Sequence, residues 1–194
     1  MRHDLQVDGF AFRLRPVEMS DAEFIVELRT GDPSRVRYLH SISPDLEAQR
    51  QWLAEYFLRA GDYYWVIERI GNGCAEGLVG VYDFDEGPRW AEWGRWVLRS
   101  QSLAAVESAL LVYRVAFEHM ELIQLDCVTV AENQSVLSFH DSCGLPRIAL
   151  EKGQIELADG SFDGVRHQCD RSLYPQVVER LEPQAKRIQA RLSR

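Results

Sequence analysis

The chain has 194 residues, of which 46% are hydrophobic and 27% are charged, and its net charge is −8 at pH 7. These values match ordinary globular domains and exclude a disordered chain, while the acidic balance argues against a protein that coats nucleic acid. The four cysteines, Cys74, Cys127, Cys143 and Cys169, form no C-x-x-C pair, and the five histidines are not spaced around them as zinc ligands. The N-terminus lacks a signal-peptide core, and no apolar run approaches the roughly 20 residues that span a bilayer. We therefore expect a cytoplasmic protein with reduced cysteines, no bound metal and no membrane span.

The first third of the chain predicts one strand and two helices. Residues 10–15 alternate between apolar and other side chains, as in a half-buried strand, and Pro16 ends it. The capping-box spacing of Ser20 and Glu23 starts a helix that continues to Arg29. An irregular loop or short helical turns follow over residues 30–42. The segment Ser43-Pro44-Asp45 then predicts the start of a second helix, which runs to about Ala60.

The remainder alternates strands and helices and ends in a helical tail. The predicted strands are 63–69, 78–84, 89–98, 123–130, 147–152 and 163–170, with turns at Gly71-Asn72-Gly73, Gly87-Pro88 and Ala158-Asp159-Gly160. The predicted helices are 102–119, 133–143, which Asn133 caps, and a tail from 174 that is interrupted at Pro183. Hairpins come early and a strand-helix-strand crossover comes late, which predicts a mixed sheet with helices on its faces. We expect one domain over residues 1–173 and a helical tail over 174–194.

This order of elements resembles the GNAT acetyltransferases over residues 10–170. The segment Ala91–Leu98 is similar to the family's fourth strand, and the helix ending Ala116-Phe117-Glu118 is similar to its central helix. The segment Leu125–Asn133 resembles the fifth strand with the asparagine that follows it, and Gly144 comes eleven residues after Asn133, the usual spacing. The resemblance implies an α/β (α+β) GNAT fold with a mostly antiparallel sheet of six to seven strands. It also implies that the fourth and fifth strands splay apart, near residues 96–98 and 128–130.

The resemblance implies an N-acetyltransferase that moves an acetyl group from acetyl-CoA, as co-substrate, to a primary amine. Residues 28–53 are similar to GNAT proteins of surface-sugar and flagellin-glycan assembly, some of which acetylate the 4-amino group of a nucleotide-linked deoxysugar. A protein N-terminal amine and a small polyamine or antibiotic amine remain as other acceptors. A different class also remains open, a degenerate GNAT fold that binds an acyl-CoA or sugar ligand without turnover. The sequence leaves a homodimer open.

The family cradles the CoA pyrophosphate with a loop of pattern Q/R-x-x-G-x-G/A, whose backbone N–H groups approach the phosphates. Here Ser100, Leu103 and Ala105 occupy its three defined positions, and Leu103 departs from the pattern. Arg99 and Ser102 are candidates to compensate with a charge and a hydroxyl. The residues that the resemblance assigns to acetyl-CoA are Trp96, Val97, Leu98, Ser102, Ala104, Ala105 and Asn133.

Acetyl transfer needs a base for the amine and a proton for the departing thiolate. The resemblance places Glu92 beside the cleft as the base, with Asp83 and Asp85 as alternatives. Glu92 can instead be a solvated or ion-paired strand carboxylate with a structural role. His140 stands seven residues after Asn133, where many family members have tyrosine, and it is expected to titrate near neutrality and protonate the thiolate.

Two further groups have both a functional and a structural reading. Arg29, Arg35 and Arg37 are candidates to hold an acceptor diphosphate, or they are solvated surface residues. We predict that the three tryptophans of residues 90–96 form core and pocket wall, with a stacking platform for a nucleotide base as the alternative: Trp90, Trp93 and Trp96.

Overall fold

The computed structural model describes residues 1–85 and 89–193. They form one sheet of eight strands in the order β1-β2-β3-β4-β5-β6-β8-β7. The strands are β1 (Val7–Asp8), β2 (Phe12–Pro16), β3 (Tyr63–Arg69), β4 (Ala75–Tyr82), β5 (Trp90–Leu98), β6 (Gln124–Val130), β7 (Arg147–Leu157) and β8 (Gly160–Asp170). The helices are α1 (Ala22–Thr30), α2 (Pro33–Val36), α3 (Leu46–Tyr56), α4 (Ala105–Arg114), α5 (Gln134–Ser142) and α6 (Tyr174–Leu192), with a 3-10 turn η1 (Met19–Asp21) and a π-helical turn η2 (Val115–His119).

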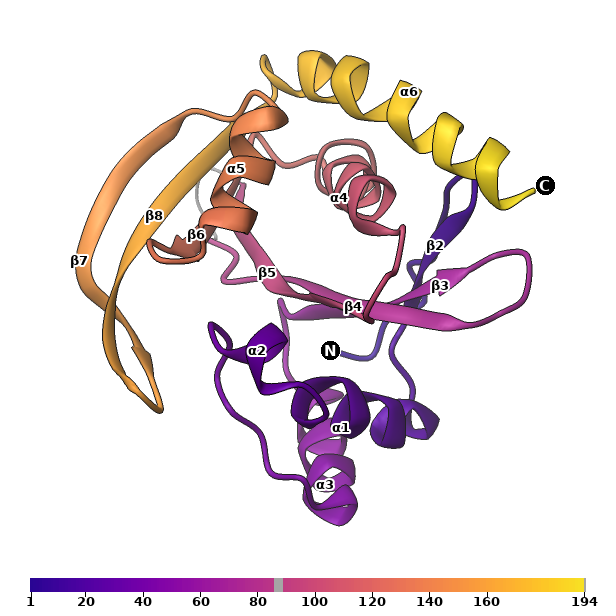
Figure 1. The fold of residues 1–194 in the computed structure, drawn as a ribbon, viewed down its shortest axis with the longest axis vertical. Coiled ribbons are helices and arrows are strands. Elements are labelled where there is room, and N and C mark those ends of the chain that lie inside the picture. Colours follow the sequence, from indigo (N-terminus) through magenta and orange to yellow (C-terminus); the bar gives the residue numbers. More distant parts are fainter. Residues whose placement is uncertain (86–88, 194) are drawn as a thin grey trace.

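Helices cover both faces of this sheet (Figure 1). Helices α4, α5 and α6 lie on one face and α1, α2 and α3 on the other. Neighbouring residues of β3 divide between two cores, because side chains alternate along a strand: Trp65 packs on the α4 side and Tyr64 on the α1 side. Strands β5 and β6 are parallel, whereas the other neighbouring pairs are antiparallel. The predicted mixed, mostly antiparallel sheet with helices on both faces is confirmed.

The sheet has one strand more than the predicted six to seven. The additional strand is β1, in which Val7 pairs with Leu14 and Asp8 pairs with Arg13. A strand of two residues is too short to show an alternating pattern, so only its pairing with β2 reveals it.

The β7–β8 hairpin is much longer than predicted. Each strand has eleven residues, and the two close on the tight turn that Ala158 and Asp159 predict, with Leu157 paired to Gly160. A register shift between Glu151 and Ile155 interrupts the alternation of β7, which hid its second half. The hairpin curves away from the sheet toward α2 (Figure 1), where the Tyr38 and Phe162 rings lie 6.5 Å apart.

Several helix ends differ from the predictions because other residues cap them. The capping box at the first helix joins Glu18 and Asp21 and not Ser20 and Glu23. At α3 the Asp45 side chain accepts the Glu47 N–H, so Pro44 lies outside the helix. That helix ends at Tyr56 and not near Ala60.

The ends of one strand and the start of one helix also differ from the predictions. Strand β4 begins at Ala75 and ends at Tyr82, where the sequence predicted 78–84. Helix α4 begins at Ala105 and not at Ser102. The turn predicted at Gly87-Pro88 lies outside the described residues.

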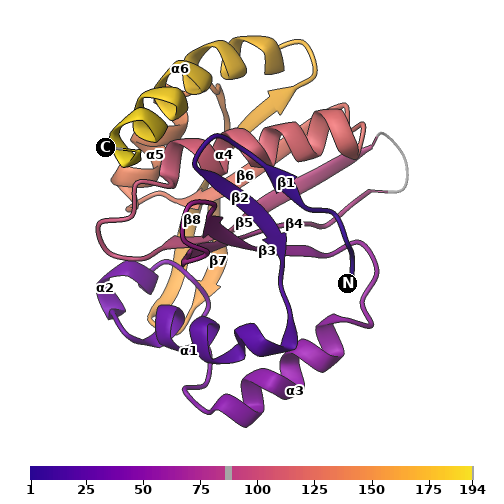
Figure 2. The same ribbon diagram turned by 90° about the vertical axis from the view of Figure 1, so that its right-hand side faces the viewer.

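Helix α6 runs alongside α4 on the same face of the sheet (Figure 2). Val177, Leu181 and Ala185 are buried in the core shared with α4. The predicted interruption at Pro183 is wrong, because the helix continues through it. Pro183 is on the exposed side, where the carbonyl that loses its hydrogen bond can be hydrated. None of the described helices is long and apolar enough to cross a membrane.

Candidate active site

The sheet opens between β5 and β6. These strands pair only at Trp90–Gln124, Ala91–Leu125 and Glu92–Asp126, and the paired positions end there. The predicted splay is therefore confirmed, but it begins several residues before the expected position near 96–98. From Trp93 onward, the backbone groups on the β5 edge that faces β6 have no strand partner among the described residues. Because such groups need hydrogen-bond partners, they can bind a ligand.

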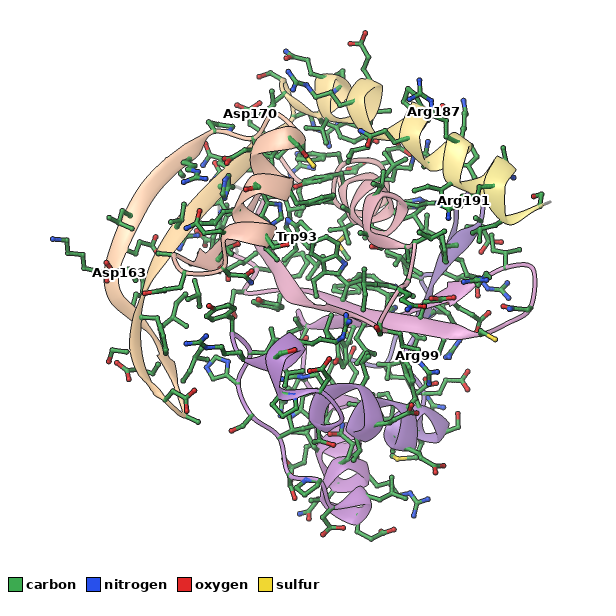
Figure 3. All side chains as sticks on the ribbon, in the orientation of Figure 1. Trp93, Arg99, Asp163, Asp170, Arg187 and Arg191 are labelled. Carbon is green, nitrogen blue, oxygen red and sulfur yellow. The ribbon has the colours of Figure 1, made fainter. Side chains whose placement is uncertain are left out.

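A β-bulge in β5 bends the strand at this point. Gly94 pairs with Gly80 but Val97 pairs with Leu78, so β5 has one extra residue, and Arg95 adopts a φ of 51°. The extra residue reverses the alternation of side chains. Trp93 thus packs on the α4 side (Figure 3), whereas Val97 packs on the α1 side.

A cavity of about 780 Å³ occupies the opening and continues toward α1 and α3. Glu92, Trp96, Asn133 and His140 line it together, although they come from β5 and α5. Val97 and Leu98 are not among its lining residues and pair with β4. The structure thus brings both candidate catalytic residues to one cavity.

Glu92 is the last residue of β5 that pairs with β6. Burial raises the pKa of Glu92 from 4.5 to about 7; the Arg166 guanidinium opposes the rise, and the carboxylates of Asp83, Glu151 and Asp126 add to it. Near neutral pH the carboxyl group is therefore divided between its protonated and ionised forms. Of the two alternative bases, Asp83 lines the cavity and Asp85 does not.

No pattern in the sequence indicated the cation beside Glu92. Arg166 on β8 contacts Glu151 at 2.7 Å, Asp126 at 3.4 Å and Glu92 at 3.5 Å. Arg166 and Glu92 are 74 positions apart in the chain, and only the pairing of β6 with β5 and β8 unites them. One guanidinium thus holds three carboxylates in place on the α1 side of the sheet.

His140 lies on the opposite, α4 side of the opening. It is 2% exposed, and the rings of Trp93, Trp96 and His167 surround it at centroid distances of 5.4, 6.3 and 5.2 Å. Burial, together with His167, lowers the pKa of His140 from 6.5 to about 3. The expectation that this ring titrates near neutrality is wrong. A neutral imidazole can still donate one N–H hydrogen bond.

Behind His140, a chain of polar contacts leads to the surface. The His167 Nε2 lies 3.1 Å from Asp141 Oδ1, and Asp141 is bound by the Arg147 guanidinium at 2.9 and 2.6 Å. Hydrogen bonds from Arg147 lower the pKa of Asp141 to about 2. His167 is fully buried, and the sequence offered no signal that it stands next to His140.

The candidate pyrophosphate loop has its polar side chains already engaged. The Ser102 hydroxyl accepts the Ala104 N–H at 3.2 Å, and Arg99 pairs with Glu27 at 3.1 Å. Leu103 packs against the main core, and Ala104 is fully buried. Helix α4 follows at Ala105, and the N–H groups of its first turn have no partner within the helix.

Asn133 has both a structural place and a place in the cavity. Its side chain accepts the Val136 N–H and so caps α5, as the sequence predicts, and it also lines the cavity.

The three candidate acceptor-binding arginines do not lie together in the cavity. Arg29 lines the cavity and donates to the His40 carbonyl oxygen. Arg35 is exposed and joins Asp32 and the Ser100 hydroxyl, each at 2.9 Å. Arg37 is also exposed and lies over the Tyr38 ring. Among the tryptophans, Trp93 and Trp96 line the cavity while packing on the core, and Trp90 does not line it.

A sheet that opens between two parallel strands, with a carboxylate at the opening, is the arrangement that the GNAT resemblance predicts. The GNAT acetyltransferase domain model matches residues 12–146. The chain belongs to this family.

Solved structures share this fold. Apo FdhC, described as a nucleotide-linked sugar GNAT, is similar with 30% identity and a TM-score of 0.76, over 91% of this chain and 96% of that one. An acetyltransferase structure from T. thermophilus is similar with 23% identity and a TM-score of 0.79, over 95% and 98% of the two chains. The spermidine N-acetyltransferase SpeG from Vibrio cholerae shares the fold at 16% identity and a TM-score of 0.73, over 86% and 97%. No curated protein sequence matches the chain.

Proposed function

We propose that the protein transfers an acetyl group from acetyl-CoA to the primary amine of a nucleotide-linked amino sugar, with Glu92 as the base. The observation that carries the proposal is the position of Glu92. Its carboxyl group lines the cavity where β5 and β6 part, and its pKa of about 7 suits proton transfer near neutral pH.

When bound, acetyl-CoA supplies an acetyl group activated as a thioester. The free edge of β5 near Trp96 supports an orientation in which backbone N–H groups stabilise charge on the thioester oxygen. Glu92 accepts the proton that the amine loses as the C–N bond forms and the C–S bond breaks. The departing thiolate is proposed to accept a hydrogen bond from the neutral His140 N–H. It takes up its proton from solvent water, and Glu92 returns the amine's proton to solvent.

The pyrophosphate of acetyl-CoA is proposed to bind backbone N–H groups of the loop before α4. Ser102, Ala104 and Ala105 place small side chains at the start of this helix, where N–H groups favour phosphate. The inward packing of Leu103 supports a loop whose outer surface remains accessible. Asn133, at the cavity wall, is the proposed contact for the pantetheine arm.

Arg29 supports an acceptor that carries an anionic group. The other two cavity arginines are neutralised, Arg95 by Asp62 and Arg166 by three carboxylates. Among the described residues no carboxylate pairs with Arg29, and its Nε is buried without a hydrogen bond. A diphosphate offers oxygens that a guanidinium binds well. The similarity to FdhC favours the same class of acceptor, and Arg35 and Arg37 are proposed as outer contacts.

A ligand-binding protein without turnover is the second candidate. Leu103 favours it, because this residue replaces a glycine of the phosphate loop pattern. Other acceptors, a peptide N-terminus or a polyamine, share the same catalytic requirement. We place the reaction in the cytoplasm, which the four free cysteines support.

A turnover screen with acetyl-CoA tests these alternatives. The purified chain is assayed by release of free thiol with nucleotide-linked amino sugars, peptides and polyamines in parallel. We expect the highest kcat/KM with an amino sugar that carries a diphosphate, and a loss when the diphosphate is removed. Turnover only with peptides or polyamines would refute this acceptor, and acetyl-CoA binding without any turnover would favour the binding protein.

A further inference from the structure

Tyr82, the last residue of β4, lies beside Glu92 at the wall of the cavity. It pairs with Glu92 across the two antiparallel strands, so both side chains lie on the same face of the sheet. Tyr82, Glu92 and Gly94 all line the cavity.

The ring of Tyr82 extends diagonally along β5, from Glu92 toward the opened end of the sheet. A β-carbon added at Gly94 would lie 2.3 Å from the Tyr82 hydroxyl oxygen and 3.3 Å from Cζ. The phenol oxygen thus fills the space that any other residue at 94 would occupy. It stands two residues beyond Glu92, in the segment where β5 no longer pairs with β6.

Arg95 holds the ring in this orientation. Its guanidinium carbon lies 4.4 Å from the centroid of the Tyr82 ring, and Asp62 fixes the guanidinium with two hydrogen bonds of 2.6 and 3.1 Å. The bulge at Arg95 that opens β5 therefore also directs the phenol.

The hydroxyl group of Tyr82 is available to a ligand. Within residues 1–85 and 89–193 it has no hydrogen-bond partner in the protein. Burial, together with the nearby Glu92 carboxylate, raises the pKa of Tyr82 well above its ordinary value, so the group remains a neutral phenol at physiological pH. A neutral phenol oxygen can accept an N–H hydrogen bond.

We propose that Tyr82 is a positioning residue that binds the acceptor's amino group between Glu92 and the opened end of the sheet. This inference rests on the proposed function. One N–H of the amine is donated to the Tyr82 oxygen and another faces Glu92, which leaves the nitrogen lone pair directed toward the thioester.

Three variants of the full chain test this role by steady-state kinetics, with the best acceptor of the turnover screen. Tyr82→Phe should lower kcat/KM for the acceptor about tenfold, mostly through KM, because one hydrogen bond is lost. The KM for acetyl-CoA should stay within about twofold, a difference too small to reflect a lost hydrogen bond. Gly94→Ala should produce a similar loss, since its methyl group displaces the hydroxyl.

The double variant Tyr82→Phe/Gly94→Ala should lose little more than Tyr82→Phe, because the ring without its oxygen keeps only the 3.3 Å contact at Cζ, which a small ring shift relieves. Tyr174→Phe, which removes a hydroxyl outside the cavity, is the control and should keep the acceptor KM. Additive losses in the double variant, or equal losses for both substrates, would indicate a merely structural role and overturn the inference. An unchanged acceptor KM in Tyr82→Phe would overturn it while the proposed function stands. A wild-type chain without turnover on any acceptor would remove the function and this inference with it.

Discussion

Glu92 and His140 show how burial shifts the pKa values of two titratable residues in opposite directions at one opening. The pKa of Glu92 rises to about 7 and that of His140 falls to about 3, because in both cases burial disfavours the ionised form. Arg166 limits the rise at Glu92, and at His140 the Asp141 carboxylate opposes the fall without outweighing burial. At neutral pH one group can still accept a proton and the other is fixed in its neutral form.

Replacement of Glu92 by glutamine tests the proposed base. Glu92→Gln should lower kcat by about 10²- to 10⁴-fold, the usual effect of removing a general base, while the Kd for acetyl-CoA stays nearly unchanged. In the wild type, kcat/KM should rise with pH through about 7, since the ionised carboxylate is the active form. The variant should recover part of its activity at high pH, where the amine loses its proton unaided.

Glu132→Gln, at an exposed position outside the cavity, is the matched control. If Glu92→Gln keeps the wild-type rate and pH profile while its Tm is unchanged, another group is the base, and Asp83 is then the first to test.

His140 should act as a hydrogen-bond donor that does not titrate in the working range. His140→Ala should lower kcat by a constant factor across about pH 6 to 9, the range that brackets histidine titration in the unfolded chain. His140→Gln, which retains an N–H donor, should recover part of the loss. A loss confined to one side of pH 7 would show that the ring ionises in the active protein.

At the scale of elements, the site depends on the ends of β5, β6 and α4 more than on their middles. The parallel pairing of β5 with β6 stops at Glu92–Asp126, and the bulge at Arg95 turns β5 away. The turn before α4 points Leu103 inward. Because Leu103 points inward, it leaves the outer surface of the proposed acetyl-CoA phosphate loop uncovered, although it replaces a glycine of the family pattern.

Leu103→Gly should therefore change the acetyl-CoA Kd less than tenfold, or about 1.4 kcal/mol. The same substitution should lower the free energy of unfolding by roughly 1–2 kcal/mol, because an apolar side chain leaves the core and glycine loosens the chain. Calorimetric titration and chemical unfolding measure the two effects. Leu103→Ala, which keeps a β-carbon, is the companion variant.

A gain in affinity well beyond tenfold in Leu103→Gly alone would show that the leucine blocks the phosphate site in the natural chain. The ligand-binding protein without turnover would then be the better description.

At the scale of the whole molecule, buried titratable groups make stability depend on pH. His140 binds fewer protons in the folded chain than in the unfolded chain, because folding lowers its pKa to about 3. Its contribution is fully present above pH 6.5, the unfolded value, and is lost as the pH falls toward 3. Glu92 acts in the opposite sense: with its pKa raised from 4.5 to about 7, its contribution is fully present below pH 4.5 and is lost as the pH rises through about 7.

His140→Phe isolates the histidine contribution, because phenylalanine suits the surrounding rings and does not titrate. Between neutral pH and about pH 4, the unfolding free energy of the wild type should fall by on the order of 3 kcal/mol more than that of the variant. Urea unfolding at several pH values measures the difference. Parallel pH dependences of the two proteins would contradict a buried neutral His140.

Some of the molecule follows from the sequence alone. Alternation and helix periodicity indicate the order of strands and helices, and the motif around Asn133 indicates the cap of α5 and the GNAT family. Such features are decided by residues close together in the chain, because hydrogen bonds and side-chain direction repeat over a few positions. The sequence also singled out Glu92 and His140 as candidates.

Only the tertiary structure decided what surrounds these candidates. Strand pairing brings Arg166 and Tyr82 beside Glu92, and packing brings His167 beside His140. No local sequence pattern predicts such contacts between distant segments. The pKa values of Glu92 and His140 depend on burial, which belongs to the assembled fold. For the same reason the length of β7 and the continuity of α6 through Pro183 could not be predicted, since both depend on neighbours that the fold brings alongside.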